Sequence, residues 1–244
     1  MKLPTGKPAV TAATAAEVVL SAEENEALKT ATLKSGSNES VTKHIAMDCE
    51  MVGIGRDGID SYLARCSIVN RYGHTLYDEH VVPKEKVTDY RTWVSGIRPK
   101  DVSRKNALPF EKVQADVMKL CKGKILIGHA LKNDFKALLL AHPRRDIRDT
   151  ARYKPFRKLM GGRTPGLAKL CKKLLGFEVQ QGEHSSVEDA QVPMAIYTKY
   201  KAEWEQRLRD QVGGSADRVK EKEAKKARKK EYDAAVAAKR KSAY

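Results

Sequence analysis

The sequence has 244 residues, of which 41% are hydrophobic, and it carries a formal net charge of +16 at pH 7. No apolar run approaches the roughly 20 residues of a membrane-spanning helix, and the first 20 residues lack the charged-then-apolar order of a signal peptide. We therefore expect neither a membrane protein nor a secreted one. The positive charge is concentrated in residues 42–204, with a net charge of +11, and in residues 205–244, with +6. Such a surface is often only solvated, but it also fits a polyanionic partner such as nucleic acid.

Residues 1–41 are rich in Ala, Thr, Ser, Glu and Lys and show little hydrophobic periodicity. This composition predicts a flexible N-terminal arm, with at most a short helix around residues 15–28.

From His44 the pattern changes to that of a folded domain, which we expect to span residues 42–204. Three strands joined by short turns predict an antiparallel meander, at residues 44–51, 64–70 and 75–82. Two further strands and four helices follow, with the helices at residues 110–122, 131–141, 166–176 and 186–204 and the strands at residues 124–128 and 147–150. This order predicts a mixed five-stranded sheet flanked by helices, which is an α/β fold of the ribonuclease H kind.

The cysteines of this domain are Cys49, Cys66, Cys121 and Cys171, and they form no C-x-x-C pair. This spacing argues against a structural zinc site. Because each lies in an apolar stretch, we expect four buried free thiols in a reducing compartment.

Residues 213–215 (GGS) are expected to break the chain after the domain. Residues 205–244 form a basic tail that contains the clusters KKARKK at 225–230 and KRK at 239–241. The tail has high helix propensity but a thin apolar face, which predicts either a solitary helix or a segment that is ordered only under some conditions.

Two acids lie on the first predicted strand. Asp48 and Glu50 are two residues apart, so both side chains point to the same face among apolar neighbours. Two such carboxylates repel each other and are costly to desolvate unless a cation lies between them. Oxygen ligands favour Mg²⁺ or Mn²⁺ over zinc. Taken alone, the pair also fits an acid that points to solvent at the strand end.

Three more polar residues occupy helix starts, where each has an ordinary explanation. Asp134 falls early in the helix that follows the strand at 124–128, and an acid there can simply offset the helix dipole. Asp189 lies about one turn into the last helix; the capping-box pattern at its start explains Glu188 but not Asp189. His184 precedes that cap in a loop, where a histidine is commonly only a surface residue.

Taken together and in this order, the five residues resemble the DEDD exonuclease superfamily, in its histidine-containing branch, over residues 42–203. The longer motifs resemble a eukaryotic subgroup that includes the RNA exonuclease 4 proteins and the interferon-stimulated 20-kDa exonuclease. They are MDCEMVG at 47–53, ARCS at 64–67, DYRTWVSG at 89–96 and HSSVEDA at 184–190.

The resemblance implies a role for each residue. Asp48 would bridge two metal ions, Mg²⁺ or Mn²⁺, and Glu50, Asp134 and Asp189 would complete the ligand shells. His184 would take a proton from the attacking water, which suits an imidazole that titrates near neutral pH. The implied reaction is 3′→5′ hydrolysis that releases nucleoside 5′-monophosphates.

Four residues are candidate substrate contacts. Met51 and Val52 follow the acids directly and can offer apolar surface and backbone groups to the terminal nucleotide. The resemblance suggests that Arg91 faces the substrate, where a guanidinium can bond a phosphate or a ribose 2′-OH. Leu131 can pack under the terminal base. Core packing explains Met51 and Leu131 equally well.

The leading hypothesis is a monomeric exoribonuclease that acts on single-stranded RNA in the nucleus and nucleolus, during ribosomal RNA processing. Its compartment and pathway come only from the resemblance and the basic tail. Two alternatives remain open: a non-catalytic RNA-binding factor of pre-ribosomal particles, and an exonuclease that prefers DNA.

Overall fold

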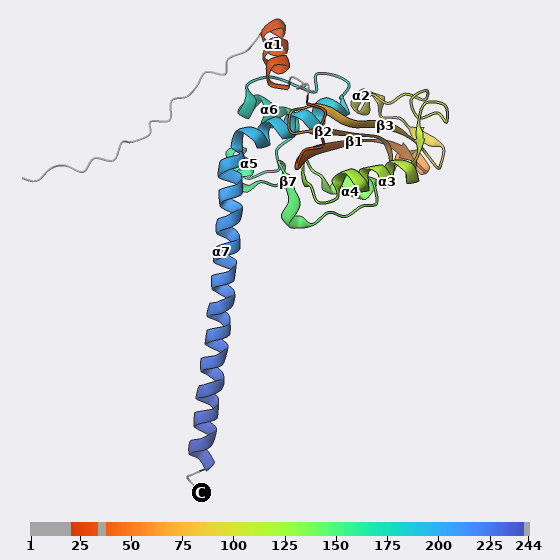
Figure 1. Ribbon diagram of the computed structural model, residues 1–244. Helices are drawn as coiled ribbons and strands as arrows, with labels where there is room; N and C mark the ends of the chain where they lie inside the picture. Colours follow the sequence, from red (N-terminus) through yellow and green to blue (C-terminus); the bar gives the residue numbers. More distant parts are fainter. Residues whose placement is uncertain (1–20, 34–37, 242–244) are drawn as a thin grey trace, which may run out of the picture.

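The computed structural model describes residues 21–33 and 38–241 (Figure 1). Its centre is a seven-stranded sheet in the order β5-β3-β2-β1-β6-β7, with β4 paired to β1 beside this path. The strands are β1 (His44–Ile54), β2 (Asp60–Asn70), β3 (Thr75–Val82), β4 (Val87–Asp89), β5 (Leu108–Pro109), β6 (Ile125–Gly128) and β7 (Ile147–Asp149). The helices are α1 (Ala22–Leu33), α2 (Thr92–Ser95), α3 (Phe110–Cys121), α4 (Lys132–Ala137), α5 (Lys154–Leu159), α6 (Leu167–Leu175) and α7 (Ser186–Lys241), and the 3-10 turns are η1 (Arg56–Gly58) and η2 (Arg144–Asp146).

The expected α/β fold with a mixed sheet is confirmed. Strands β1, β2 and β3 form the expected antiparallel meander, and β6 and β7 add to β1 in parallel. The expected number of five strands is too low, because the sequence pattern does not reveal β4 and β5. These strands are only three and two residues long, so neither carries the alternation that marks a longer strand.

The alternation of side chains along β1 divides the core between the two faces of the sheet. Ile45 and Met47 pack with residues of α3 and α4 on one face. Ala46 packs with residues of α5, α6 and α7 on the other face. Figure 1 shows α6 and the first part of α7 on the side of the sheet opposite α3 and α4. By the same alternation, residues 48 and 50 point toward α7.

The helices of the domain agree with the expected ones except at some ends. Helix α3 has nearly the expected bounds, and Gly176 ends α6 with a φ of 89°, as a glycine after a helix commonly does. Helix α4 ends at Ala137 rather than near residue 141, because Leu139 takes a φ of +51°, which no helix accommodates.

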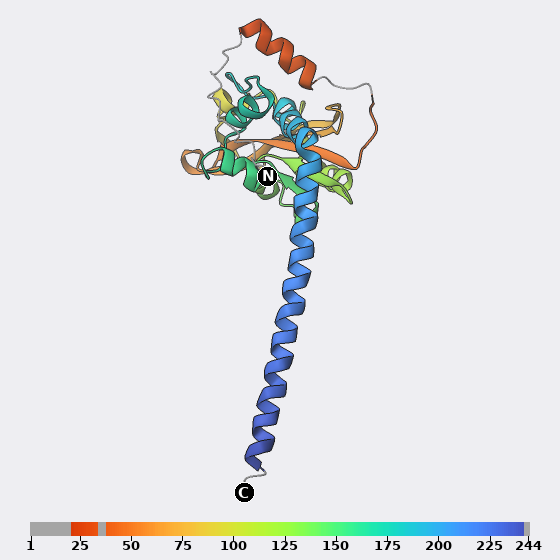
Figure 2. The same cartoon turned by 90° about the vertical axis from the view of Figure 1, so that its left-hand side faces the viewer.

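Helix α7 begins at Ser186, as expected, but continues to Lys241, so the expected break at residues 213–215 is wrong. A glycine costs a helix only about 1 kcal/mol, and the Lys-, Glu- and Ala-rich sequence beyond has the propensity to continue the helix. The basic tail is therefore an extension of the last helix of the domain, and it points away from the sheet (Figure 1 and Figure 2). Within the described residues, no helix combines the length and the apolar character needed to cross a membrane.

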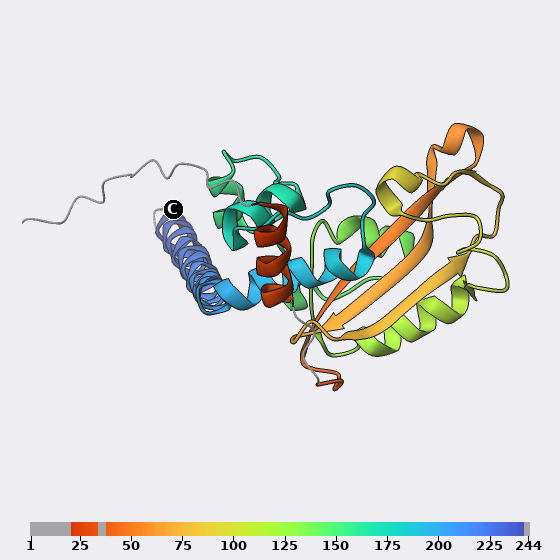
Figure 3. The same cartoon turned by 90° about the horizontal axis from the view of Figure 1, so that it is seen from above.

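Part of the expected N-terminal arm is folded and docked. Helix α1 lies across the first part of α7 (Figure 3). Lys29 forms an ion pair of 3.0 Å with Glu188 of α7, Asn25 donates a hydrogen bond of 3.1 Å to the carbonyl of Glu178, and Leu33 is buried in the core. The helix expected around residues 15–28 thus lies further along the chain, and residues 1–20 of the expected arm fall outside the described residues.

All four cysteines are free and buried, which confirms the expected thiols. Burial raises the pKa of Cys171 to about 12, so this thiol stays protonated and unreactive at neutral pH.

Candidate active site

Strand β1 supplies two acids to the face of the sheet that α7 covers. Glu50 is only 7% exposed, whereas Asp48 is partly exposed. The register between β1 and β2 shifts directly after Glu50, at a bulge between Glu50 and Met51. Because a bulge re-aims the side chains around it, this irregularity separates the two acids from the regular strand that follows.

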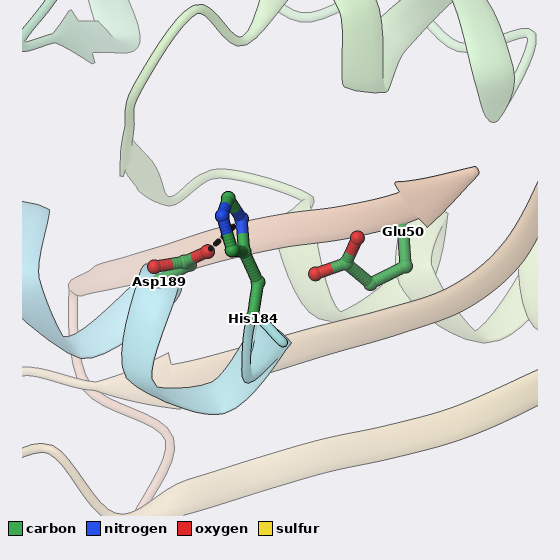
Figure 4. Close-up of side chains that lie close together, drawn as sticks. All are labelled: Glu50, His184 and Asp189. Carbon is green, nitrogen blue, oxygen red and sulfur yellow. Dashed lines mark ion pairs between the residues drawn. The ribbon is translucent and has the colours of Figure 1, made fainter. Parts of the chain in front are cut away.

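The start of α7 brings His184 and Asp189 to these acids. Nδ1 of His184 lies 3.3 Å from Oδ2 of Asp189, and the imidazole lies between Asp189 and Glu50 (Figure 4). One possible ligand atom from each of the three residues lies within 4.8 Å of the others. The hydroxyl of Ser186 donates a hydrogen bond of 3.2 Å to the carbonyl of Asp48, which fixes the helix start against β1.

Helix α4 contributes Asp134, which is 4% exposed. The strand before α4 ends at Gly128, where a Cβ atom would lie 2.4 Å from Cδ2 of Leu131 and 2.9 Å from the carbonyl oxygen of Met47. Only glycine allows this close approach, which lets α4 begin directly beside β1. The side chain and the main chain of Cys49 both act to lower the pKa of Asp134 against the effect of burial, so the residue between Asp48 and Glu50 also influences the third acid.

Asp48, Glu50 and Asp134 all have raised pKa values. Burial, followed by the negative charges of Asp134, Asp189 and Glu50, raises the pKa of Asp48 well above its ordinary value. Burial and the charge of Asp189 raise the pKa of Glu50 to about 7, and burial raises the pKa of Asp134 to about 7. The hydrogen bond to Asp189 raises the pKa of His184. When the members of such a cluster ionise, their negative charge is not balanced. An empty site for a cation has the same property.

The residues fit the expected metal ions. Oδ1 of Asp189 is buried and has no hydrogen-bond partner among the described residues, although buried polar atoms are ordinarily paired. Three nearly buried carboxylates and the partly exposed Asp48 offer oxygen ligands, the type that Mg²⁺ and Mn²⁺ prefer. The unpartnered oxygen of Asp189 and the set of carboxylate ligands therefore both suit a metal ion held by Asp48, Glu50, Asp134 and Asp189.

The loop that carries His184 is fixed to α2. The amide of His184 donates a hydrogen bond of 2.8 Å to the carbonyl of Val94, and Arg98 forms an ion pair of 2.7 Å with Glu183. Gly96 has a φ of +66°, and a Cβ atom there would lie 3.2 Å from the carbonyl oxygen of His184. The motif at 89–96 thus helps to position the imidazole from a distant part of the sequence.

The four candidate substrate contacts lie in different environments. Val52 and Leu131 are almost completely buried, and Met51 is half-buried against the core cluster that contains Leu131, which favours packing for these side chains. The guanidinium of Arg91 donates hydrogen bonds of 2.8 Å to the carbonyl of Gly58 and 2.9 Å to the hydroxyl of Ser61, which ties it to the β1–β2 connection. Substrate contact by these four residues stays a prediction.

Two residues that support the site had no clear signal in the sequence. Gln180, with a φ of +60°, donates a hydrogen bond of 2.9 Å to Oδ2 of Asp189. Asp149 ends β7 and accepts hydrogen bonds from the amides of Ala130 and Ala151, which holds the turn before α4. For Asp149, the only indication in the sequence was the position of an acid at the end of a predicted strand.

Residues 45–197 match the protein-family model RNase_T, described as Exonuclease. RNA exonuclease 4 of Mycosarcoma maydis is 53% identical over 182 residues, which cover 74% of this chain and 48% of that protein. RNA exonuclease 4 of Saccharomyces cerevisiae is 51% identical over 174 residues, which cover 71% of this chain and 60% of that protein. The chain thus spans about half the length of the curated relatives it matches.

Among solved structures, the chain is similar to the Saccharomyces cerevisiae apo Pan2 pseudoubiquitin hydrolase-RNA exonuclease module in complex with AAGGAA RNA. The TM-score is 0.59 at 34% sequence identity, and the match covers 71% of this chain and 31% of that chain.

Proposed function

We propose that this chain, which belongs to the exonuclease (RNase_T) family, is a metal-dependent 3′→5′ exoribonuclease. The observation that carries the proposal is the convergence of Asp48, Glu50, Asp134 and Asp189 with His184 at one place, although they come from β1, α4 and α7. A protein that only binds RNA has no use for four clustered acids, because they repel a polyanion.

Metal ions bound by the four acids would supply a charge that stabilises the attacking and the leaving oxygen of an in-line displacement. The protein itself supplies the proton acceptor. Because Asp189 occupies Nδ1 of His184, Nε2 is the nitrogen left to take a proton from water. The water oxygen bonds to phosphorus, the bond from phosphorus to the 3′ oxygen breaks, and a nucleoside 5′-monophosphate leaves a shortened strand.

His184 suits the role of this base. Its side chain is 25% exposed, so water and substrate can reach it, while the adjacent Asp189 is 5% exposed. A buried carboxylate next to a ring nitrogen fixes the ring orientation and stabilises the imidazolium that forms when the base accepts its proton.

RNA as the substrate rests on the relatives. They are named RNA exonuclease 4 at about half identity, and the similar Pan2 module was solved with RNA. The net charge of +16 is consistent with a nucleic-acid substrate. Action in the nucleus and nucleolus, on ribosomal RNA precursors and within pre-ribosomal particles, is the finer part of the proposal. It is supported only by the family resemblance of the sequence motifs and by the basic α7.

The substrate class and the direction are tested with 5′-labelled strands in Mg²⁺. We expect a ladder of shortening products from single-stranded RNA with a free 3′-OH, and strong resistance from the same RNA with a 3′-phosphate. Circular RNA should stay intact. Rapid cleavage of the circular RNA would show that the chain is an endonuclease. Faster degradation of a matched DNA strand would show that DNA, not RNA, is the preferred substrate.

A further inference from the structure

A second concave site lies outside the acidic cluster, at the edge of the sheet formed by β7. It is a cavity of about 650 Å³ lined by residues from α4, β7, α5 and α7 and from the segments between them. Pockets of about 300–1,000 Å³ are of a size that holds nucleotide-sized ligands. Neither the family match nor the five residues of the acidic site assign a role to this cavity.

The rim of the cavity is basic. Five exposed Lys and Arg side chains line it. Arg207 pairs with Glu203, and the other four have no ion-pair partner within the described residues: Lys132, Arg144, Arg152 and Lys154. The single acid in the lining is Asp149, whose Oδ1 already accepts two main-chain hydrogen bonds. Four unpaired positive charges around one concave surface favour an anionic ligand with several negative groups.

The inner wall of the cavity is aromatic. Tyr153 stacks on Trp204 with ring centroids 3.8 Å apart and an angle of 11°, and Phe135 stacks on His142. The hydroxyl of Tyr153 is buried and has no hydrogen-bond partner among the described residues. Aromatic walls below a basic rim suit a strand in which phosphates alternate with planar bases.

The cavity is close to the acidic site and continues away from it. Helix α4 gives Asp134 to the acids and gives Lys132 and Phe135 to the cavity, so a single helix, about 10 Å thick, separates the two. At its other end the cavity reaches Arg207 and Gln211 of α7. Beyond them the helix continues to Lys241, and the side chains of Lys225, Lys226 and Lys229 are exposed.

We propose that this cavity is an exosite that binds the RNA strand several nucleotides upstream of its 3′ end and directs it along α7. The inference rests on the proposed exonuclease function, because it assigns a path to the same substrate. The exosite contributes to binding of long strands and takes no part in the hydrolysis of the terminal bond.

The test uses the full chain with the triple change Arg144→Gln, Arg152→Gln and Lys154→Gln. A matched control removes three exposed cations that do not line the cavity, with Arg104→Gln, Lys119→Gln and Lys122→Gln. Binding of a 20-nucleotide and a 3-nucleotide labelled RNA is measured by fluorescence anisotropy in EDTA, in which a metal-dependent nuclease does not cut, at several salt concentrations.

We expect the cavity variant to bind the 20-nucleotide RNA about tenfold more weakly than the control. The slope of the logarithm of the binding constant against the logarithm of the salt concentration should be smaller by about 2, because each lost phosphate contact lowers this slope by about 0.7. Both variants should bind the 3-nucleotide RNA equally, and both should melt within about 1 °C of the wild type, because the changed side chains are exposed. Equal binding of the long RNA by the two triple variants would overturn the exosite.

The readout in EDTA keeps this inference separate from the proposed function. With Mg²⁺, the cavity variant should degrade the 3-nucleotide RNA at the wild-type rate and show a raised KM only for the long RNA. A loss of cleavage on both lengths would also overturn the exosite, because the cavity would then belong to the reaction itself. If the wild type binds long RNA through the cavity but cleaves no RNA in Mg²⁺, the exonuclease proposal fails while RNA binding at the cavity stands.

Discussion

Asp189 shows how one residue can serve two purposes in this site. Its Oδ2 contacts Nδ1 of His184 and accepts a hydrogen bond from Gln180, whereas its Oδ1 is buried without a partner. In the proposed mechanism, the first oxygen orients the base and the second is left for a cation. His184, the proposed base, thus depends on one of the proposed metal ligands for its position.

Replacement of His184 by Ala is expected to lower kcat by about 10²–10⁴-fold, the usual contribution of a general base, and to change KM little. The wild-type rate should rise with pH through a pKa above 6.5, because Asp189 raises the pKa of His184, and this step should be absent in the variant. Steady-state rates between about pH 5.5 and pH 9 check both points. A variant that keeps the wild-type rate and pH profile would remove His184 from the mechanism.

The raised carboxylate pKa values predict the pH dependence of stability in metal-free protein. Glu50 and Asp134 have a pKa of about 7 in the folded chain and lower ordinary values when unfolded. The folded chain therefore holds more protons, and the free energy of unfolding falls as the pH rises from about 4.5 to about 7. The raised pKa of His184 acts in the same direction, since its stabilisation is complete below 6.5 and is lost above its folded pKa.

In EDTA we therefore expect a melting temperature that is several degrees lower at about pH 8 than at about pH 5.5. Mg²⁺ should raise it more at the higher pH, because metal binds the ionised acids. Scanning fluorimetry at the two pH values measures both effects, with Glu50→Gln as a control that should flatten the dependence. A melting temperature that rises with pH in EDTA would contradict the buried acidic cluster.

Among the elements, α7 determines the position of the site, and its anchoring to β7 is specific. Arg148 of β7 is 5% exposed and forms a bidentate pair with Glu205 of α7, at 2.7 and 2.9 Å. The hydroxyl of Tyr197 donates a further hydrogen bond of 2.8 Å to Glu205. Removal of one partner of a buried pair leaves an uncompensated charge, which is far more costly than the loss of an exposed pair.

Glu205→Ala is therefore expected to lower the free energy of unfolding by about 3 kcal/mol. The matched control is Glu203→Ala, which removes an exposed pair with Arg207 and should cost less than about 0.5 kcal/mol. Urea unfolding of the two variants gives the comparison. Equal small losses would show that the Arg148 pair does not anchor α7.

The elements also show how far the sequence could lead. The alternation of β1, which places Asp48 and Glu50 on one face, and the start of α7 could be predicted from local patterns. The grouping of these two acids with Asp189 came only from the resemblance to the exonuclease superfamily. The hydrogen bond from Ser186 to the carbonyl of Asp48 joins residues 138 positions apart, and no local pattern encodes such a contact. The continuation of α7 through residues 213–215 was mispredicted because local turn residues outweighed the helix propensity of the sequence beyond them.

In the whole molecule, a small acidic site lies within a strongly basic chain. Residues 42–204 and residues 205–244 both carry net positive charge, whereas the proposed metal ligands are four acids. A basic surface attracts the phosphate backbone of RNA over a range of about 10 Å at moderate salt. The four acids would repel a phosphate unless cations compensate them, so substrate binding at the site and metal binding are expected to be coupled.

The central claim is that these acids make the chain a metal-dependent exonuclease. It is tested most directly by comparing the wild type with Asp48→Asn, a change of similar size that removes one charge, on 5′-labelled single-stranded RNA in Mg²⁺ and in EDTA. We predict processive or stepwise 3′ shortening by the wild type in Mg²⁺, none in EDTA, and a rate at least about 10³-fold lower for Asp48→Asn, which should still bind the RNA. Undiminished degradation by Asp48→Asn, or by the wild type in EDTA, would contradict the account.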